Sequence, residues 1–260
     1  MEGKSRKLCC FPERCPCCKE ILPVLRLQKK FAMIYYHNGI IEGETTMKRI
    51  IQIAMFGFCF LSTFCGADEM KIVCFGDSLT SCGGPGGRYS DMLQKSLPQY
   101  RIINSGKGGD TLGGGLARLD QAVLHHHAQY LIVGLGANDY WRRKRTLNEL
   151  KKDYETILAR CTAAGMKIVI ISCFGKEKLP PGTVLDFDRA GLPLEHYAAG
   201  LALIERELAG KYHAGYVPDM QCGITPKGRR DLWSDSNHPN AAGNRIVADT
   251  ILPELRKILK

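Results

Sequence analysis

The sequence predicts a three-layer α/β/α sandwich in which helices cover both faces of a five-stranded parallel sheet. From residue 70 onward, short apolar runs alternate with segments of helical periodicity. The runs are almost wholly apolar, which is typical of parallel strands buried on both faces. A chain of 260 residues with 45% hydrophobic and 24% charged residues also fits one globular domain plus an additional segment.

Each predicted element rests on its own pattern. Five apolar runs are expected to be strands: 71–75, 101–104, 130–136, 167–174 and 215–218. Five segments place apolar residues at helical spacing: 88–97, 111–127, 146–164, 194–210 and 239–259. Gly165 is expected to end the third helix, and Pro253 to interrupt the last. Right-handed crossovers then give a flavodoxin-like sheet, with residues 175–193 as a long loop.

Chemically capable side chains follow the strands of this predicted sheet. Ser78 follows the first strand, a glycine-rich stretch with Gly109 follows the second, and Asn138 follows the third. Asp235 and His238 lie in the loop before the last helix. Because ligands of such sheets bind beyond the carboxyl ends of the strands, these loops are expected to converge on one crevice. A serine nucleophile, a histidine base and an aspartate that orients the base are the three parts of a serine hydrolase.

Each of these residues also has a structural interpretation in isolation. Ser78 could cap a helix, and Asn138 could form a turn. Asp235 and His238 could form a surface turn. The glycines around Gly109 could hold a phosphate, but no Gly-Lys-Ser/Thr sequence or complete dinucleotide fingerprint follows them. The serine, the glycine-rich stretch, the asparagine and the Asp–His pair occur together and in this order along the chain. Their combination favours the hydrolase over the separate structural interpretations.

The same residues lie in motifs that resemble those of the SGNH (GDSL) hydrolases. The blocks are FGDSLT with Ser78, NSGKGGDT with Gly109, GLGAND with Asn138, and DSNHPN with Asp235 and His238. The resemblance is closest to the thioesterase I / lysophospholipase L1 / arylesterase branch. It implies a catalytic triad of Ser78, Asp235 and His238. It also implies an oxyanion hole built from the backbone N–H groups of Ser78 and Gly109 and the side-chain amide of Asn138.

The resemblance covers about residues 70–258 and carries an expectation for the reaction. It implies a serine esterase that hydrolyses carboxylic ester or thioester bonds through an acyl-enzyme. The expected substrate is a small-molecule ester, a lysophospholipid or an acyl-thioester, and no metal or organic cofactor is implied. Two alternatives remain: a carbohydrate O-acetylesterase, and a non-catalytic binding protein on the same fold. The complete set of site residues argues against the binding protein.

The charge of the chain does not favour a nucleic-acid partner. The formal net charge is +10, and about half of the excess lies before residue 68. No basic stripe with interleaved aromatic residues occurs in 68–260, the segment expected to form the hydrolase domain.

Residues 47–67 have the pattern of a secretory signal peptide. Lys48 and Arg49 precede the apolar run IIQIAMFGFCFLSTF, and small residues follow it. We therefore expect a periplasmic or secreted protein with no stable membrane span after cleavage, because about 20 apolar residues are needed to cross a bilayer. The alternatives are an N-terminal membrane anchor and a lipoprotein using Cys65, although the bulky Phe64 precedes that cysteine.

Residues 1–46 show no clear period and hold five of the twelve cysteines. Since a signal peptide begins its chain, our hypothesis is that Met47 is the true start and that 1–46 is a mis-called or disordered extension. The alternative is a small zinc-binding module. Its cysteines lack a second pair or a histidine pair at finger spacing.

Overall fold

The computed structural model describes residues 69–142, 144–174, 179–180, 182–224 and 229–259. The predicted extension over 1–46 and the predicted signal peptide over 47–67 lie outside the described residues. Within the described part, no helix combines the length and the apolar character that a membrane crossing requires.

Five parallel strands form the sheet, in the order β2-β1-β3-β4-β5. Their bounds are β1 Lys71–Gly76, β2 Arg101–Gly106, β3 Tyr130–Gly134, β4 Lys167–Ile171 and β5 Gly215–Val217. This order is that of the flavodoxin-like sheet, so the predicted fold class is confirmed. The direction in which the chain adds strands reverses at β1, which places the topological switch point between β1 and β3.

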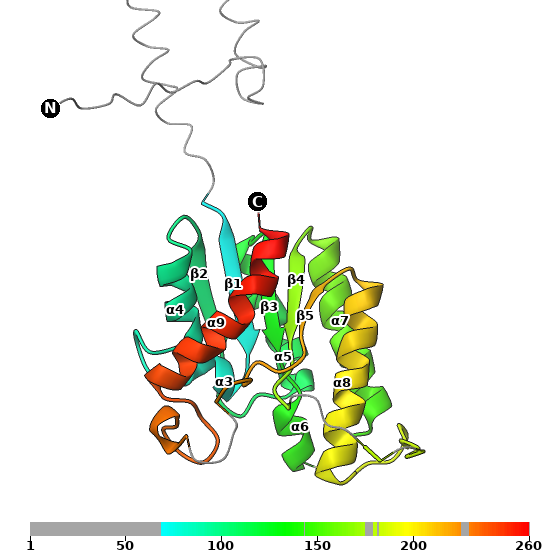
Figure 1. Ribbon diagram of the computed structural model, residues 1–260. Helices are drawn as coiled ribbons and strands as arrows, with labels where there is room; N and C mark the ends of the chain where they lie inside the picture. The colour runs from blue at the N-terminus through cyan, green and yellow to red at the C-terminus, as the bar shows by residue number, and fades with distance from the viewer. Residues whose placement is uncertain (1–68, 143, 175–178, 181, 225–228, 260) are drawn as a thin grey trace, which may run out of the picture. The chain divides into compact units, whose positions relative to one another are not determined.

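Helices cover both faces of the sheet (Figure 1). On one face lie α4 (Tyr89–Ser96) and α9 (Ala241–Ile258), and on the other α5 (Leu112–Ala122), α7 (Leu147–Ala163) and α8 (Leu194–Lys211). The remaining helical segments are short: α3 (Ser78–Ser81), α6 (Ala137–Arg142), η1 (Leu124–His126) and η2 (Arg230–Leu232).

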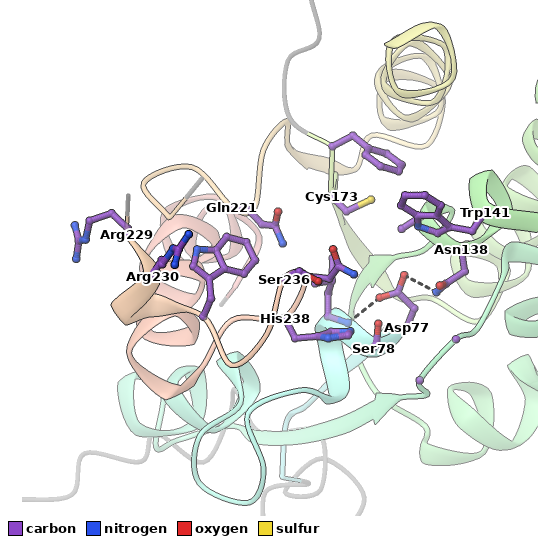
Figure 2. Close-up of a pocket in the computed structure, with 17 residues that line it drawn as sticks. Asp77, Ser78, Asn138, Trp141, Cys173, Gln221, Arg229, Arg230, Ser236 and His238 are labelled. Carbon is purple, nitrogen blue, oxygen red and sulfur yellow. Dashed lines mark hydrogen bonds between the residues drawn. The ribbon is translucent and has the colours of Figure 1, made fainter. Parts of the chain in front are cut away.

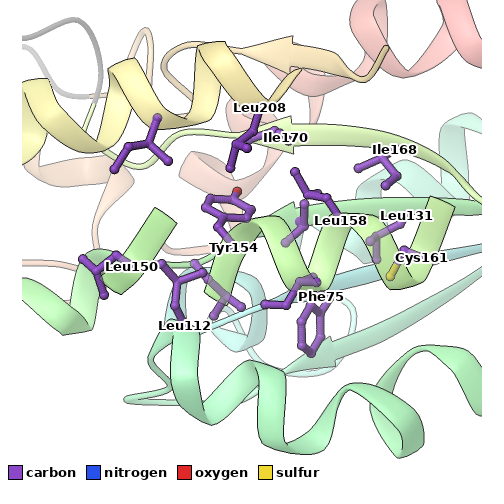
Figure 3. Packing of buried hydrophobic residues seen from close by; sticks show 14 of the residues in the cluster. Phe75, Leu112, Leu131, Leu150, Tyr154, Leu158, Cys161, Ile168, Ile170 and Leu208 are labelled. Atoms are coloured by element: carbon purple, nitrogen blue, oxygen red, sulfur yellow. The ribbon is translucent and has the colours of Figure 1, made fainter. Parts of the chain in front are cut away.

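The strands are apolar throughout because both of their faces are buried. In β1, Val73 and Phe75 belong to the core beneath α5, α7 and α8, whereas Ile72 and Cys74 belong to the core beneath α4 and α9. Figure 3 shows the first core, in which Phe75 and Tyr154 lie between the sheet and the helices. This two-sided burial is the physical reason for the unbroken apolar runs in the sequence.

Several predicted bounds differ from the structure. The helix expected over 111–127 ends at Ala122, and a 3-10 turn continues its leucine pattern. The strand expected over 167–174 ends at Ile171. Helices α3 and α6, of four and six residues, were missed because such short segments do not complete an apolar period.

Pro253 does not interrupt the last helix, contrary to the prediction. Helix α9 continues from Ala241 to Ile258 with Pro253 inside it. Proline removes one backbone donor and crowds the preceding turn. Ile251 and Leu255 are fully buried on either side of it, so packing against the sheet holds the helix together across the proline.

Candidate active site

A pocket of about 960 Å³ opens at the carboxyl ends of the strands (Figure 2). Ser78 after β1, Gly109 after β2 and Asn138 at the start of α6 all line it. Phe174 after β4 and His238 before α9 complete its main walls. The structure therefore brings four of the five predicted site residues to one pocket. The fifth, Asp235, does not line the pocket itself but is hydrogen-bonded to His238.

Ser78 is the first residue of helix α3, and it is not the helix cap. The N-cap is Asp77, whose Oδ1 accepts from the backbone N–H of Leu79 at 2.9 Å. The capping interpretation of Ser78 is therefore wrong. With the cap supplied by its neighbour, Ser78 lies half-buried on the wall of the pocket.

Helix α3 is held closely against the end of β2. The side-chain amide of Asn104 donates to the carbonyl of Thr80 at 2.7 Å. A Cβ at Gly106 would lie only 2.6 Å from the backbone nitrogen of Ser81, so glycine is required there for the two segments to approach. These contacts fix the position of the short helix that carries Ser78.

His238 and Asp235 form a directly bonded pair. The Nδ1 of His238 lies 2.8 Å from Asp235 Oδ2 and 3.0 Å from Oδ1. Oδ1 also accepts from the backbone N–H groups of Asn237 at 2.7 Å and His238 at 2.9 Å. The Asn237 bond, followed by the His238 side chain, lowers the pKa of Asp235 to about 2. Asp235 is therefore a carboxylate at neutral pH, suited to hold a proton on Nδ1 of the imidazole.

The loop that carries this pair is fastened at its base. Trp233 and Pro239 form an antiparallel bridge, and Ser234 N donates to His238 O at 2.8 Å. Asn240 then caps α9: its Oδ1 accepts from the backbone N–H groups of the first turn, and its Nδ2 donates to Asp231 O at 2.7 Å. The bridge and the cap fix the direction in which His238 enters the pocket.

The resemblance assigns the oxyanion hole to the backbone N–H groups of Ser78 and Gly109 and the side-chain amide of Asn138. Within the described residues, neither the backbone N–H of Ser78 nor that of Gly109 donates to a protein acceptor. Gly109 has φ +70°, and a bond from Asp110 N to Lys107 O at 3.1 Å closes the turn around it. The amide of Asn138 donates to Asp110 O at 2.9 Å and makes a longer contact of 3.3 Å with Asp77 Oδ2.

Arg118 is a supporting residue that the sequence did not reveal. Its Nε donates to Asp110 Oδ2 at 2.6 Å, and its other two nitrogens donate to the carbonyls of Ser105 at 2.9 Å and Gly76 at 3.0 Å. The guanidinium also stacks 4.5 Å from the centre of the Phe75 ring. One side chain on α5 thus joins the ends of β1 and β2, and no spacing along the chain indicates such a contact.

Two further aspartates brace the pocket from inside the protein. Burial, with a smaller contribution from nearby Asp110, raises the pKa of Asp77 to about 6, although the Leu79 N–H and His238 oppose the shift. Burial likewise raises the pKa of Asp139, whose Oδ2 accepts from Leu112 N at 2.9 Å and so joins α6 to α5. Through these contacts, Asp77 holds the start of α3 and Asp139 holds the start of α5.

Several other pocket residues carried no motif in the sequence. Trp141, Phe174 and Trp233 supply aromatic surface, and Arg229 and Arg230 supply positive charge. Trp141 is 66% exposed, so much of its indole is open to solvent at the pocket. No group of three or more His, Cys, Asp and Glu side chains gathers as a metal site would within the described ranges.

Comparison with known proteins identifies the family. The family model described as "GDSL-like Lipase/Acylhydrolase family" matches residues 74–246, which is more than half of the chain. The chain belongs to the GDSL-like lipase/acylhydrolase family. This confirms the resemblance inferred from the four motifs.

Curated relatives within the GDSL-like family are named as esterases. The chain is 22% identical to esterase TesA of Pseudomonas aeruginosa, over 82% of this chain and all of the relative. It is 23% identical to thioesterase 1/protease 1/lysophospholipase L1 of Escherichia coli K12, over 78% of this chain and 92% of the relative. The family and these relatives confirm the expected activity: this GDSL-like protein is a serine ester hydrolase.

Solved structures share the fold of this GDSL-like hydrolase. A crystal structure of TesA matches with a TM-score of 0.59 and 24% identity, covering 73% of this chain and all of the other. The acetyl xylan esterase AlAXEase matches with a TM-score of 0.55 and 23% identity, covering 73% of this chain and all of the other.

Proposed function

We propose that Ser78, His238 and Asp235 form the catalytic triad of this esterase. The observation that carries the proposal is the bond between His238 Nδ1 and Asp235 at 2.8 Å, with the imidazole beside Ser78 in the same pocket (Figure 2). Asp235 holds the proton on Nδ1, which leaves Nε2 unprotonated and able to accept a proton from Ser78 Oγ. Serine needs such a base because its hydroxyl is a weak nucleophile on its own.

The reaction then proceeds in two acyl transfers. Ser78 Oγ attacks the carbonyl carbon while His238 takes the hydroxyl proton, and the carbonyl oxygen becomes an oxyanion. His238 returns the proton to the leaving oxygen or sulfur as its bond to the acyl carbon breaks. Water, deprotonated by His238, attacks the acyl-enzyme in the same way and releases the acid.

The oxyanion would be bound by the backbone N–H groups of Ser78 and Gly109 and by the Asn138 amide. The two N–H groups have no acceptor among the described residues, which supports this assignment. One N–H of the Asn138 amide is bound to Asp110 O at 2.9 Å, which sets the position of the side chain. The oxyanion would take the second N–H, which makes the longer 3.3 Å contact with Asp77 Oδ2 in the free protein. One donor of this kind typically stabilises the transition state by about 3–4 kcal/mol.

For the substrate, we infer a carboxylic ester or thioester with an acyl chain longer than acetyl. Trp141, Phe174 and Cys173 give one side of the pocket an apolar surface, which favours an alkyl chain. The names of the relatives, esterase TesA and thioesterase 1/lysophospholipase L1, agree with this choice. The second candidate is a carbohydrate O-acetylesterase, which the fold shared with an acetyl xylan esterase favours.

The triad is tested by Ser78→Ala in the domain spanning 68–260. We expect complete loss of p-nitrophenyl ester hydrolysis and of fluorophosphonate labelling, with an unchanged circular dichroism spectrum. Ser236→Ala is the matched control, because Ser236 lines the same pocket. Retained activity in the Ser78 variant would falsify the assignment. A panel of acetyl to decanoyl p-nitrophenyl esters, with an acetylated xylan beside it, then separates the two substrate classes.

We also propose that residues 47–67 are a cleaved signal peptide and that the hydrolase domain at 68–260 is periplasmic or secreted. The proposal rests on the positive, apolar and small-residue sequence of this segment. N-terminal sequencing of the native protein tests it: a first residue near position 68 is expected, and a mature N-terminus within 1–46 would contradict it.

A further inference from the structure

We propose that Arg118 is a positioning residue of the oxyanion hole, and that it holds the three proposed donors in their places relative to one another. The inference rests on the proposed function of Ser78, Gly109 and Asn138. Arg118 is not among the described residues that line the pocket. It would therefore act through the segments that it binds, and not by touching the substrate.

The Arg118 side chain is bonded in three directions at once. Its Nε donates to Asp110 Oδ2 at 2.6 Å, its Nη1 to Ser105 O at 2.9 Å, and its Nη2 to Gly76 O at 3.0 Å. A guanidinium can do this because its donors diverge from one planar, rigid group. Only 19% of the side chain is exposed, and the guanidinium lies over the Phe75 ring. It cannot turn toward a ligand without losing these contacts.

Asp110 connects Arg118 to two of the proposed donors. The Asp110 carboxylate is buried and paired with Arg118. The backbone N–H of Asp110 closes the turn around Gly109, and its carbonyl accepts from the Asn138 amide. A Cβ at Gly114 would clash with Asp110 Oδ1, so the carboxylate fits closely against the first turn of α5. Displacing this carboxylate would move both the Gly109 turn and the Asn138 amide.

Gly76 connects Arg118 to the third donor. Gly76 is the last residue of β1 and lies two positions before Ser78. Its carbonyl accepts from Arg118 and also from the backbone N–H of Lys107 at 3.0 Å. The end of β1 is thereby joined to the loop that leads to Gly109. One guanidinium thus bonds the segment that carries the Ser78 N–H and the segment that carries the Gly109 N–H.

Arg118→Lys tests the proposal, because lysine keeps the positive charge but replaces the three-way fork with one ammonium group. The substrate is the p-nitrophenyl ester that wild type hydrolyses fastest. We expect kcat to fall about 10–100-fold with KM within about twofold of wild type, since misplaced donors weaken binding of the transition state more than binding of the substrate.

Asp110→Asn is the second variant and separates position from charge. It removes the charged acceptor of Arg118 but keeps the carbonyl that binds Asn138. We expect kcat to fall as in Arg118→Lys. If charge alone mattered, Asp110→Asn would leave kcat unchanged or raise it, because it removes a negative charge close to the developing oxyanion.

A pair of ketone inhibitors reports on the oxyanion hole directly. Ser78 Oγ adds to an alkyl trifluoromethyl ketone as His238 takes the hydroxyl proton, and the carbonyl oxygen becomes an oxyanion. The methyl ketone with the same alkyl chain, matched to the acyl chain of the ester, binds without this step. In both variants the inhibition constant of the trifluoromethyl ketone should rise about 10–100-fold, in step with the loss of kcat. That of the methyl ketone should not change.

Arg160→Lys is the matched control. Arg160 Nη2 bonds Asp120 Oδ1 at 2.6 Å, the same distance as in the Arg118 pair, but this exposed pair joins α7 to α5 outside the pocket. The control should leave kcat and both inhibition constants unchanged. A double-mutant cycle adds a further test: Arg118→Lys should cost less activity in an Asn138→Ala background, because part of its effect passes through that amide.

The outcomes separate this inference from the proposed function. Activity in Ser78→Ala would overturn the catalytic assignment itself. If Ser78 is required but Arg118→Lys and Asp110→Asn keep the wild-type kcat, Arg118 does not position the donors. The same conclusion follows if both ketones lose affinity equally, or if the losses of Arg118→Lys and Asn138→Ala are fully additive. If neither variant folds, as judged by circular dichroism, the pair serves stability and the proposal is likewise overturned.

Discussion

The side-chain amide of Asn244 donates to the carbonyl oxygen of Cys82 across 3.2 Å, linking two positions 162 residues apart. Cys82 is the C-cap of the helix that begins at Ser78, and the same amide lies 3.4 Å from the carbonyl of Pro239, next to His238. Asn244 is fully buried. One amide thus joins the segment of the proposed nucleophile to the segment of the proposed base.

Asn244→Ala is expected to lower kcat about tenfold or more with little change in KM. Loss of the amide frees the two segments to move apart, and small displacements of reacting groups are costly. Stability should also fall by about 1–3 kcal/mol, because the buried carbonyl of Pro239 and the partly buried carbonyl of Cys82 lose their donor. Steady-state kinetics well below the melting temperature separate the two effects.

The control for Asn244→Ala is Asn148→Ala. Asn148 is an exposed residue whose amide bonds Asp188 at 2.8 Å. Equal changes in kcat for the two variants, or a rise in KM alone for Asn244→Ala, would show that Asn244 does not position the catalytic pair.

Gly109→Ala tests the proposed oxyanion donor. Its φ is +70°, and a Cβ there would meet no atom within 4 Å, so the substitution adds backbone strain without a clash. Left-handed backbone costs a non-glycine residue about 1–2 kcal/mol. We expect that loss of stability together with a kcat lowered about 10–100-fold, because the N–H moves away from the oxyanion.

Gly165→Ala provides the matched comparison for Gly109→Ala. Gly165 has φ +80° and equally open surroundings, but it lies after α7. Both variants should lose similar stability in urea unfolding, and only Gly109→Ala should lose activity. If the Gly109 variant kept the wild-type kcat, the backbone N–H of Gly109 would not take part in the mechanism.

Asp235→Asn should lower kcat by about 10³–10⁴-fold, because the amide favours the wrong tautomer of His238. Asp231→Asn, an exposed aspartate on the same segment, should have no comparable effect. Since the pKa of Asp235 is about 2, its carboxylate stays charged throughout the pH range of a normal activity profile. Activity of Asp235→Asn within tenfold of wild type would contradict its proposed role.

The stability linked to Asp235 has a definite pH dependence. A carboxyl whose pKa is lower in the folded state stabilises the protein above its unfolded pKa, and this contribution is lost as the pH falls through the folded value. The difference in thermal midpoint between wild type and Asp235→Asn should therefore be constant above pH 5 and narrow as the pH is lowered toward 3. A difference that widens on acidification would show that the bonds to Asn237 and His238 do not lower this pKa.

Glu205 is expected to make stability fall with rising pH. It is fully buried on α8, and burial raises its pKa to about 8, although Ser172 and Tyr216 offset part of the effect. The folded state keeps this proton after the unfolded chain has lost it, so its contribution to stability declines between about pH 4.5 and pH 8.

Glu205→Gln removes that titration. The free energy of unfolding of the variant, relative to wild type, should increase between pH 5 and pH 8 by roughly 1–3 kcal/mol. Urea unfolding at several pH values measures it, with exposed Glu195→Gln on the same helix as the control. A relative stability that is independent of pH would mean that Glu205 is charged in the folded protein.

Sequence alone determined the layers, the sheet and the motifs of this protein. Wholly apolar runs such as IVCF in β1 identify strands of a parallel sheet. Such strands are buried on both faces and so show no alternation of apolar and polar residues. Ser78, Gly109, Asn138, Asp235 and His238 were found because each lies in a local block, at the end of a strand or before a helix. Such local patterns depend only on neighbouring residues.

Only the tertiary structure decided how those blocks are held and what lines the pocket between them. Asp77, and not Ser78, caps α3, which depends on the backbone angles at that turn. Arg118 and Asn244 act on segments that are tens to more than a hundred residues away, so no spacing along the chain indicates them. Trp141 and Phe174 line the same pocket because folding brings α6 and the segment after β4 to one edge of the sheet.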